Sequence, residues 1–96
     1  MRKIILIGSG GSGKSTLART MGKKLSYPVD HLDVLLWRAN WEAVSREDQR
    51  AIQQALTSRD TWIIDGNYGG TLDLRIDAAD TVIFLIYRGR FVFTGH

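Results

Sequence analysis

The spacing of apolar and polar residues changes several times along this chain, and each change predicts a new element of secondary structure. Four short segments predict strands: the runs Lys3 to Ile7 (KIILI), Thr61 to Ile64 (TWII) and Thr81 to Tyr87 (TVIFLIY), which are mostly apolar, and the short segment Val29 to Leu32, which follows Pro28. The first run is continuous and not alternating, which is typical of a strand buried on both faces of a parallel sheet.

Segments with helical spacing lie between these runs. Pro28 ends the first expected helix, whose inner face carries Leu17, Ala18, Met21, Gly22 and Leu25. Ser45, followed three residues later by Asp48, is the capping signature of a second helix. We expect this helix to reach about Ser58, with an inner face of Ile52, Ala55 and Leu56. Strands that alternate with helices predict βαβ crossovers, so the expected architecture is a three-layer α/β/α fold around a parallel sheet.

The composition is that of one small globular domain, expected to span residues 1–96. The chain is 44% hydrophobic and 24% charged, and 13 basic against 10 acidic residues give a net charge of +3. The cations are dispersed, so they favour anionic ligands mildly and form no stripe for nucleic acid. The lack of cysteine excludes disulfides and thiolate metal sites, and no apolar run approaches the ~20 residues of a membrane span. We therefore expect a cytoplasmic protein without membrane or nucleic-acid partners.

The stretch GSGGSGKS directly follows the first apolar run and satisfies the pattern G-x-x-x-x-G-K-[ST] in full. Glycines let the backbone fold around an anion with its N–H groups turned inward, and the helix that follows aims its positive end at the same point. Lys14 would reach the β and γ phosphates of a nucleotide, and the Ser15 hydroxyl would ligate Mg²⁺. The alternative is a flexible glycine-serine turn, against which the flanking strand and helix argue. The predicted nucleotide-binding residues are Gly8, Ser9, Gly10, Gly11, Ser12, Gly13, Lys14, Ser15 and Thr16.

Two aspartates follow predicted strands, where ligands bind in open α/β sheets. Asp65 ends the third strand, and Asp33 follows the second. A carboxylate there can hold a Mg²⁺-bound water or accept a proton from an attacking hydroxyl, and the alternative is an N-cap or turn residue. We predict Lys14, Asp33 and Asp65 as catalytic residues, with Ser15 and Asp65 at the metal. For His31, within the second strand, a core or surface role is favoured over catalysis.

Side chains near the same end of the sheet are candidates for binding the acceptor substrate. They are Asp33, Trp37, Asn67, Tyr68 and Arg75. Trp37 suits the wall of a cleft but equally suits helix packing. The alternative for Arg75 is a solvated helix face, or an ion pair with Asp73 or Asp77.

Three stretches together resemble a known family: IILIGSGGSGKSTLA, HLDVLLW and WIIDGNYGGTLDLRIDAADTVIFL. Their order and spacing are similar to those of the bacterial DNA topology modulation proteins, also described as adenylate-kinase-related proteins. These are small P-loop proteins of the nucleoside monophosphate and shikimate kinase group. The resemblance implies a P-loop NTPase fold with a parallel sheet of strand order 2-3-1-4-5, ATP and Mg²⁺ as cofactors, and transfer of the γ-phosphoryl group to a small hydroxyl or phosphate acceptor. By likeness to shikimate and gluconate kinases, Asp33 would meet the acceptor hydroxyl.

The chain departs from this family after the fourth predicted strand. Family members continue with a lid helix that carries arginines, a fifth strand and an adenine-contacting loop, whereas residues 88–96 here have a different sequence. We therefore expect the fold to lack the fifth strand and the lid. The fourth strand would then be an edge for self-association, or Arg90 to Phe93 would fold back as a hairpin and cover it. Two functions stay open: a small-molecule kinase, and a non-catalytic nucleotide-binding or regulatory module, which the missing lid arginines favour.

Overall fold

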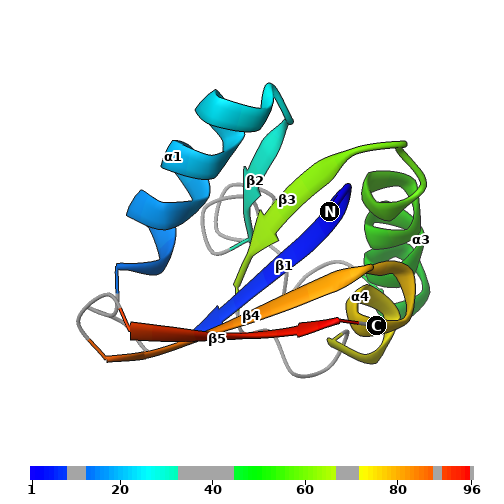
Figure 1. Cartoon of the computed structure of the whole chain (residues 1–96). Coiled ribbons are helices and arrows are strands. Elements are labelled where there is room, and N and C mark those ends of the chain that lie inside the picture. Colours follow the sequence, from blue (N-terminus) through cyan, green and yellow to red (C-terminus); the bar gives the residue numbers. More distant parts are fainter. Residues whose placement is uncertain (9–12, 33–44, 67–71, 88–89, 96) are drawn as a thin grey trace.

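The computed structural model describes residues 1–8, 13–32, 45–66, 72–87 and 90–95. They form a sheet with helices on both faces (Figure 1). The elements in chain order are β1 (Lys3–Gly8), α1 (Lys14–Leu25), β2 (Val29–His31), α3 (Arg46–Thr57), β3 (Trp62–Asp65), α4 (Leu72–Ala78), β4 (Thr81–Tyr87) and β5 (Arg90–Gly95). The predicted alternation of strands and helices is confirmed. Within the described ranges, no helix has the length and apolar character needed to cross a bilayer.

The strands are arranged in the order β2-β3-β1-β4-β5. β1 pairs in parallel with β3 and β4, and β2 pairs in parallel with β3. Parallel strands need crossover connections, and α1, α3 and α4 lie in the three connections between β1, β2, β3 and β4. The predicted parallel sheet is therefore confirmed for these four strands.

A fifth strand corrects the expectation that the sheet ends at β4. β5 runs antiparallel to β4, with Thr81 opposite Gly95. Only residues 88–89 separate the two strands, too few for the crossover that a parallel neighbour requires, so the chain returns as a hairpin. The hairpin expected for Arg90 to Phe93 is thus confirmed. β5 is therefore the edge strand on this side of the described sheet, and β4 is paired with a neighbour on both sides.

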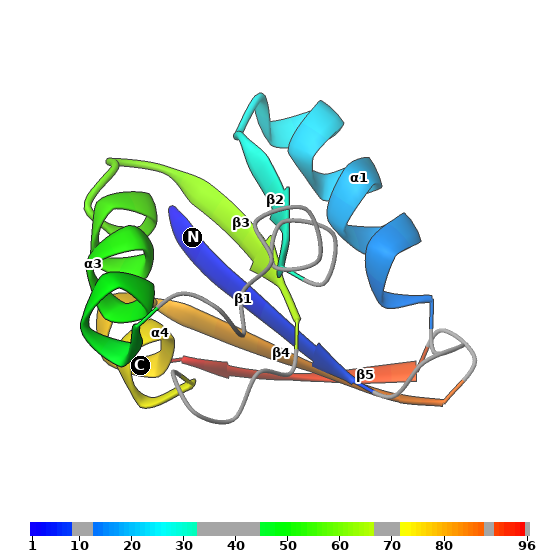
Figure 2. The same cartoon turned by 180° about the vertical axis from the view of Figure 1, so that it is seen from behind.

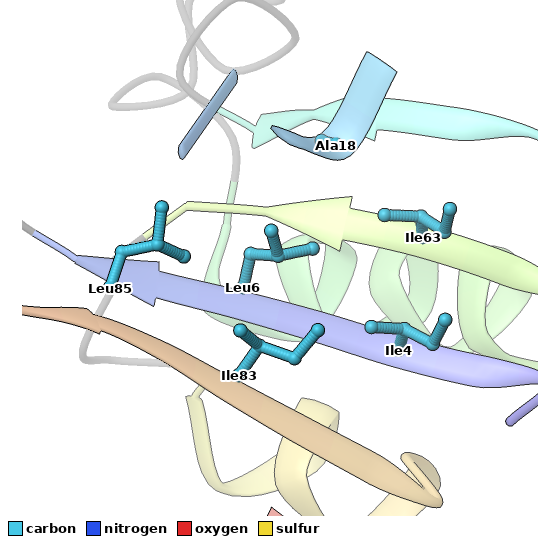
Figure 3. Packing of buried hydrophobic residues seen from close by; sticks show 6 residues of the cluster. All are labelled: Ile4, Leu6, Ala18, Ile63, Ile83 and Leu85. Carbon is cyan, nitrogen blue, oxygen red and sulfur yellow. The ribbon is translucent and has the colours of Figure 1, made fainter. Parts of the chain in front are cut away.

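The core beneath α1 is built from alternate residues of the central strands. Figure 3 shows its buried members, Ile4, Leu6, Ala18, Ile63, Ile83 and Leu85. The helix lies close to the sheet at Gly22, where an added Cβ would lie 2.2 Å from Val29 Cγ2. Ala18 and Gly22, both buried, therefore allow α1 to lie close to the sheet, whereas Leu25 at the end of the helix is exposed.

A second core lies on the opposite face, where α3 and α4 pack together (Figure 2); its buried members are Ile5, Leu32, Trp62, Ile64, Ala79 and Val82. The inner face predicted for α3 is partly wrong, because Ile52 and Ala55 are exposed whereas Gln53 and Thr57 are buried. Gln53 Oε1 accepts a hydrogen bond from Arg75 Nη1 (3.0 Å), and the Thr57 carbonyl accepts one from Trp62 Nε1 (3.1 Å). These polar groups can face inward because each is hydrogen-bonded.

The Asp80 carboxylate binds the backbone at the start of β1. Asp80 Oδ2 accepts hydrogen bonds from the backbone N–H groups of Arg2 (2.9 Å) and Lys3 (3.1 Å). Partial burial acts to raise the pKa of Asp80, but these bonds and one from the Thr81 hydroxyl outweigh it and hold the pKa below its usual value. The opposite end, where the parallel strands finish, is the edge at which α/β proteins bind ligands.

Candidate functional site

The glycine-rich segment joins the carboxyl end of β1 to the start of α1. β1 ends at Gly8 and α1 begins at Lys14, so the strand and the helix that the motif requires on its two sides are both present. Residues 9–12, which hold the predicted Ser9, Gly10, Gly11 and Ser12, lie outside the described residues. Gly13 has φ of 88°, a left-handed conformation that other residues adopt only with strain. The first turn of α1 contains no acidic residue, so its positive end is not neutralised from within the helix.

The side chain of Lys14 reaches back to the end of β1. It is largely buried, and its Nζ donates a hydrogen bond to the Gly8 carbonyl at 3.2 Å. The ammonium group is therefore held between the end of β1 and the first turn of α1. Ser15 and Thr16 are exposed in the same turn, and Thr16 Oγ1 accepts a hydrogen bond from Arg19 Nη2 at 3.5 Å. Positive charge and hydroxyl groups thus gather at the N-terminus of α1, a combination that suits an anion.

Asp65 lies on the neighbouring strand, on the side of the sheet that α1 covers. It is the last residue of β3 and pairs with Leu6 of β1, two residues before Gly8. Side chains alternate along a strand, and Ile63 belongs to the core beneath α1, so the Asp65 carboxylate is directed to that side as well. The Asp65 side chain is 3% exposed. Asp65 therefore lies beside the strand that ends at Gly8, and its predicted catalytic and metal-binding roles stay predictions.

His31 is the contact of Asp65 that sequence reasoning missed. β2 and β3 pair with His31 opposite Asp65, and His31 Nδ1 donates a hydrogen bond to Asp65 Oδ2. The His31 side chain is 25% exposed, so the buried carboxylate is joined to a more accessible imidazole. The sequence favours a core or surface role for this histidine, because it lies within a predicted strand, and its partner is 34 positions further along the chain. The signal that could have found the pair is that each lies at or near the end of a short predicted strand, and strands consecutive in the chain often pair.

Arg75 lies inside the fold. It is 1% exposed and bonded to Gln53, while Asp73 pairs with Arg50 at 3.4 Å. The solvated-face alternative for Arg75 is therefore wrong. Burial lowers the pKa of Arg75 to about 10, with the charge of Asp73 acting in the other direction, so the guanidinium stays cationic at neutral pH. A substrate role for Arg75 stays a prediction and would require access to a buried side chain.

The other predicted acceptor-binding residues, Asp33, Trp37, Asn67 and Tyr68, lie outside the described residues, and their roles stay predictions. In the described part of the chain, no three histidine, aspartate or glutamate side chains form a group that could hold a metal ion.

Comparison with known proteins gives a distant similarity. No protein-family model matches the chain. Over 83 residues the chain is 26% identical to the pentafunctional AROM polypeptide of Schizosaccharomyces pombe, and the match covers 74% of this chain and 5% of that polypeptide. The chain thus spans a small fraction of the relative's length. The resemblance to the DNA topology modulation proteins stays a prediction.

Proposed function

We propose that the chain binds ATP with Mg²⁺ through the segment from Gly8 to Thr16, in a P-loop NTPase fold like that of the nucleoside monophosphate and shikimate kinases. The observation that carries the proposal is the geometry between β1 and α1. The strand ends at Gly8, Gly13 adopts a left-handed conformation, and Lys14 returns to the Gly8 carbonyl. Helix N–H groups, the helix dipole and an ammonium group that meet at one point provide what a phosphate group requires.

The described residues fit a Mg²⁺ ion that is held mainly by a nucleotide. Mg²⁺ prefers oxygen ligands and is usually bound by one or two protein groups together with phosphate oxygens and water. Ser15 offers an exposed hydroxyl in the first turn of α1, and Asp65 offers a buried carboxylate on the same side of the sheet. These two residues would hold the ion, Asp65 through a bound water. When bound, Mg²⁺ neutralises charge on the transferred phosphoryl group.

The chemistry that this arrangement supports best is transfer of the γ-phosphoryl group to a small hydroxyl or phosphate acceptor. The acceptor oxygen forms a bond to the γ-phosphorus, the bond to the β–γ bridging oxygen breaks, and ADP leaves. Lys14 stabilises the charge on the phosphates throughout. With a hydroxyl acceptor, its proton passes to a carboxylate, for which Asp33 is the candidate.

A second candidate is a nucleotide-binding or regulatory module without catalysis, and β5 is the observation that favours it. β5 follows β4 directly through residues 88–89, in the part of the chain where the kinases that it resembles carry lid arginines. An arginine that stabilises transition-state charge typically contributes about 10³ to 10⁵ in rate. A chain that binds ATP without such a group would hydrolyse or transfer phosphate slowly.

Calorimetric titration with Mg-ATP tests the proposed site. We expect the wild type to bind and Lys14→Ala to bind at least about 30-fold more weakly, because loss of a buried charged partner costs about 2 kcal/mol or more. Lys23→Ala is the matched control, since Lys23 is an exposed lysine in the last turn of the same helix. Assay of ADP formation in the same samples separates a kinase from a binding module. Equal affinity of the wild type and Lys14→Ala would refute the site.

A further inference from the structure

We propose that His31 is a positioning residue for Asp65, whose carboxylate it orients to serve the Mg²⁺ ion of the bound nucleotide. The inference rests on the proposed function and adds to it a residue from β2. Its basis is the hydrogen bond from His31 Nδ1 to Asp65 Oδ2, which joins the last residues of two paired strands.

The register of the sheet places this pair on the side of the candidate site. Val29, two residues before His31, packs against the core beneath α1, so the imidazole is directed to the same side as the Asp65 carboxylate. In the strand order β2-β3-β1, His31 and Gly8 lie on strands that flank Asp65 from opposite sides. The carboxylate therefore lies between the imidazole and the strand that leads into the glycine-rich segment.

A hydrogen bond to one oxygen orients a carboxylate. The aspartate side chain rotates about two torsions, and the bond from His31 Nδ1 holds Oδ2 toward β2. Because the two oxygens of a carboxylate diverge, Oδ1 is directed away from His31, and β1 flanks β3 on its other side. Residues that hold a metal-binding group in this way typically contribute 10-fold to 100-fold to metal affinity.

The contact works with either charge state of the imidazole. The imidazolium and the neutral tautomer with a proton on Nδ1 both donate a hydrogen bond at this position. Asp65 benefits from such a donor because an ionised carboxylate that is 3% exposed is costly without hydrogen bonds. The role of His31 is therefore positional and does not require the histidine to exchange a proton.

Asp30 offers a matched control on the same strand. It precedes His31, and its carboxylate forms an ion pair with Arg59, beyond the end of α3. Alternation along β2 directs Asp30 to the face opposite His31. Asp30→Asn thus weakens a polar contact of β2 and leaves the hydrogen bond between His31 and Asp65 in place.

The test compares ATP affinity with saturating Mg²⁺ and with EDTA, by calorimetry, in the wild type, His31→Ala, His31→Asn and Asp30→Asn. We expect His31→Ala to reduce the gain in affinity from Mg²⁺ about 10-fold and to leave the affinity in EDTA unchanged. His31→Asn should recover part of this gain, because its amide donates a hydrogen bond, and Asp30→Asn should match the wild type. If Mg²⁺ strengthened ATP binding as much in His31→Ala as in the wild type, or if Asp30→Asn lost as much of this gain as His31→Ala, the inference about His31 would be overturned and the proposed function would stand. A wild type that does not bind ATP would overturn the proposed function as well.

A second measurement needs no substitution at His31, in case the alanine variant does not fold. In nitrogen-15 NMR of the ATP-bound chain, the His31 Nδ1 resonance should move when Mg²⁺ is added, because its carboxylate partner then serves a cation. A His96→Gln variant assigns the imidazole signals. An Nδ1 resonance that stays in place while Mg²⁺ strengthens ATP binding would contradict the proposal.

Discussion

Replacement of Gly66 by alanine should destabilise the fold through two separate effects. Gly66 follows Asp65 with φ of 148°, and an added Cβ would lie 2.7 Å from the Cβ of Leu32, a core residue that is 1% exposed. A backbone conformation of this kind costs a non-glycine residue about 1–3 kcal/mol, and overpacking a core costs about 1–3 kcal/mol more. The expected loss is therefore about 2–6 kcal/mol, from a total that is typically about 5–15 kcal/mol.

Two other glycines separate these effects. Gly13 has φ of 88°, and no atom of the described residues lies within 4 Å of an added Cβ, so Gly13→Ala should show the backbone cost alone, about 1–2 kcal/mol. Gly22 lies within α1, where the clash is with Val29 Cγ2 at 2.2 Å. Alanine there gains about 1 kcal/mol of helix propensity, which offsets part of the overpacking cost and leaves a net loss of up to about 2 kcal/mol.

Urea denaturation followed by circular dichroism gives the free energy of unfolding of each variant. We expect the free energy of unfolding to fall more in Gly66→Ala than in Gly13→Ala or Gly22→Ala. The m-values should be similar where the transitions stay two-state. A Gly66→Ala variant within about 0.5 kcal/mol of the wild type would refute the reasoning, since surface substitutions without strain or clash fall in that range.

Three further substitutions test contacts elsewhere in the fold. Asp80→Asn should lower the free energy of unfolding by about 1 kcal/mol at pH 7, because two backbone N–H groups lose a charged acceptor. Since the folded-state pKa of Asp80 is lowered, its contribution is present above the unfolded value of about 4 and is lost as the pH falls through the folded value, so urea titrations should show the stabilities of the two proteins converging as the pH falls below about 4. Ser45→Ala should cost about 1 kcal/mol, since the Ser45 hydroxyl accepts a hydrogen bond from the N–H of Asp48 at 3.1 Å, and an unchanged melting temperature would contradict this. Arg75→Met should lower the free energy of unfolding by about 1.5–3 kcal/mol, because it leaves the buried Gln53 without the hydrogen bond that joins α3 to α4. Adding Gln53→Met should recover part of this loss in urea titrations, and a double variant less stable than the single one would contradict the importance of that hydrogen bond.

β1, β3 and β4 could be predicted from sequence because strands buried in a parallel sheet carry nearly continuous apolar runs. The inner face of α3 could not, since apolar spacing gives no sign that Gln53 is buried with a partner 22 residues further along the chain. The fifth strand shows the difference between two kinds of inference. The departure of residues 88–96 from the family pattern led us to expect no fifth strand, whereas the apolar run beside a short turn predicted the hairpin that is present.

The candidate site also has parts whose placement the sequence predicts and a contact that it does not. Lys14 and its flanking elements belong to one contiguous motif, so sequence alone predicted their arrangement. The placement of Asp65 needed only the rule that parallel strands finish at one edge. The contact of His31 with Asp65 depends on the register between two strands, and register is set by packing across the sheet, not by either local sequence.

The central claim is that backbone N–H groups between Gly8 and Thr16 bind the phosphates of a nucleotide, and amide chemical shifts test it most directly. Titration of the nitrogen-15-labelled chain with Mg-ATP should move the amide resonances of residues 8–16 and of the residues around Asp65, while adenosine without phosphates should leave those of residues 8–16 in place. Amide resonances of residues 8–16 that stay in place at saturating Mg-ATP would contradict the claim.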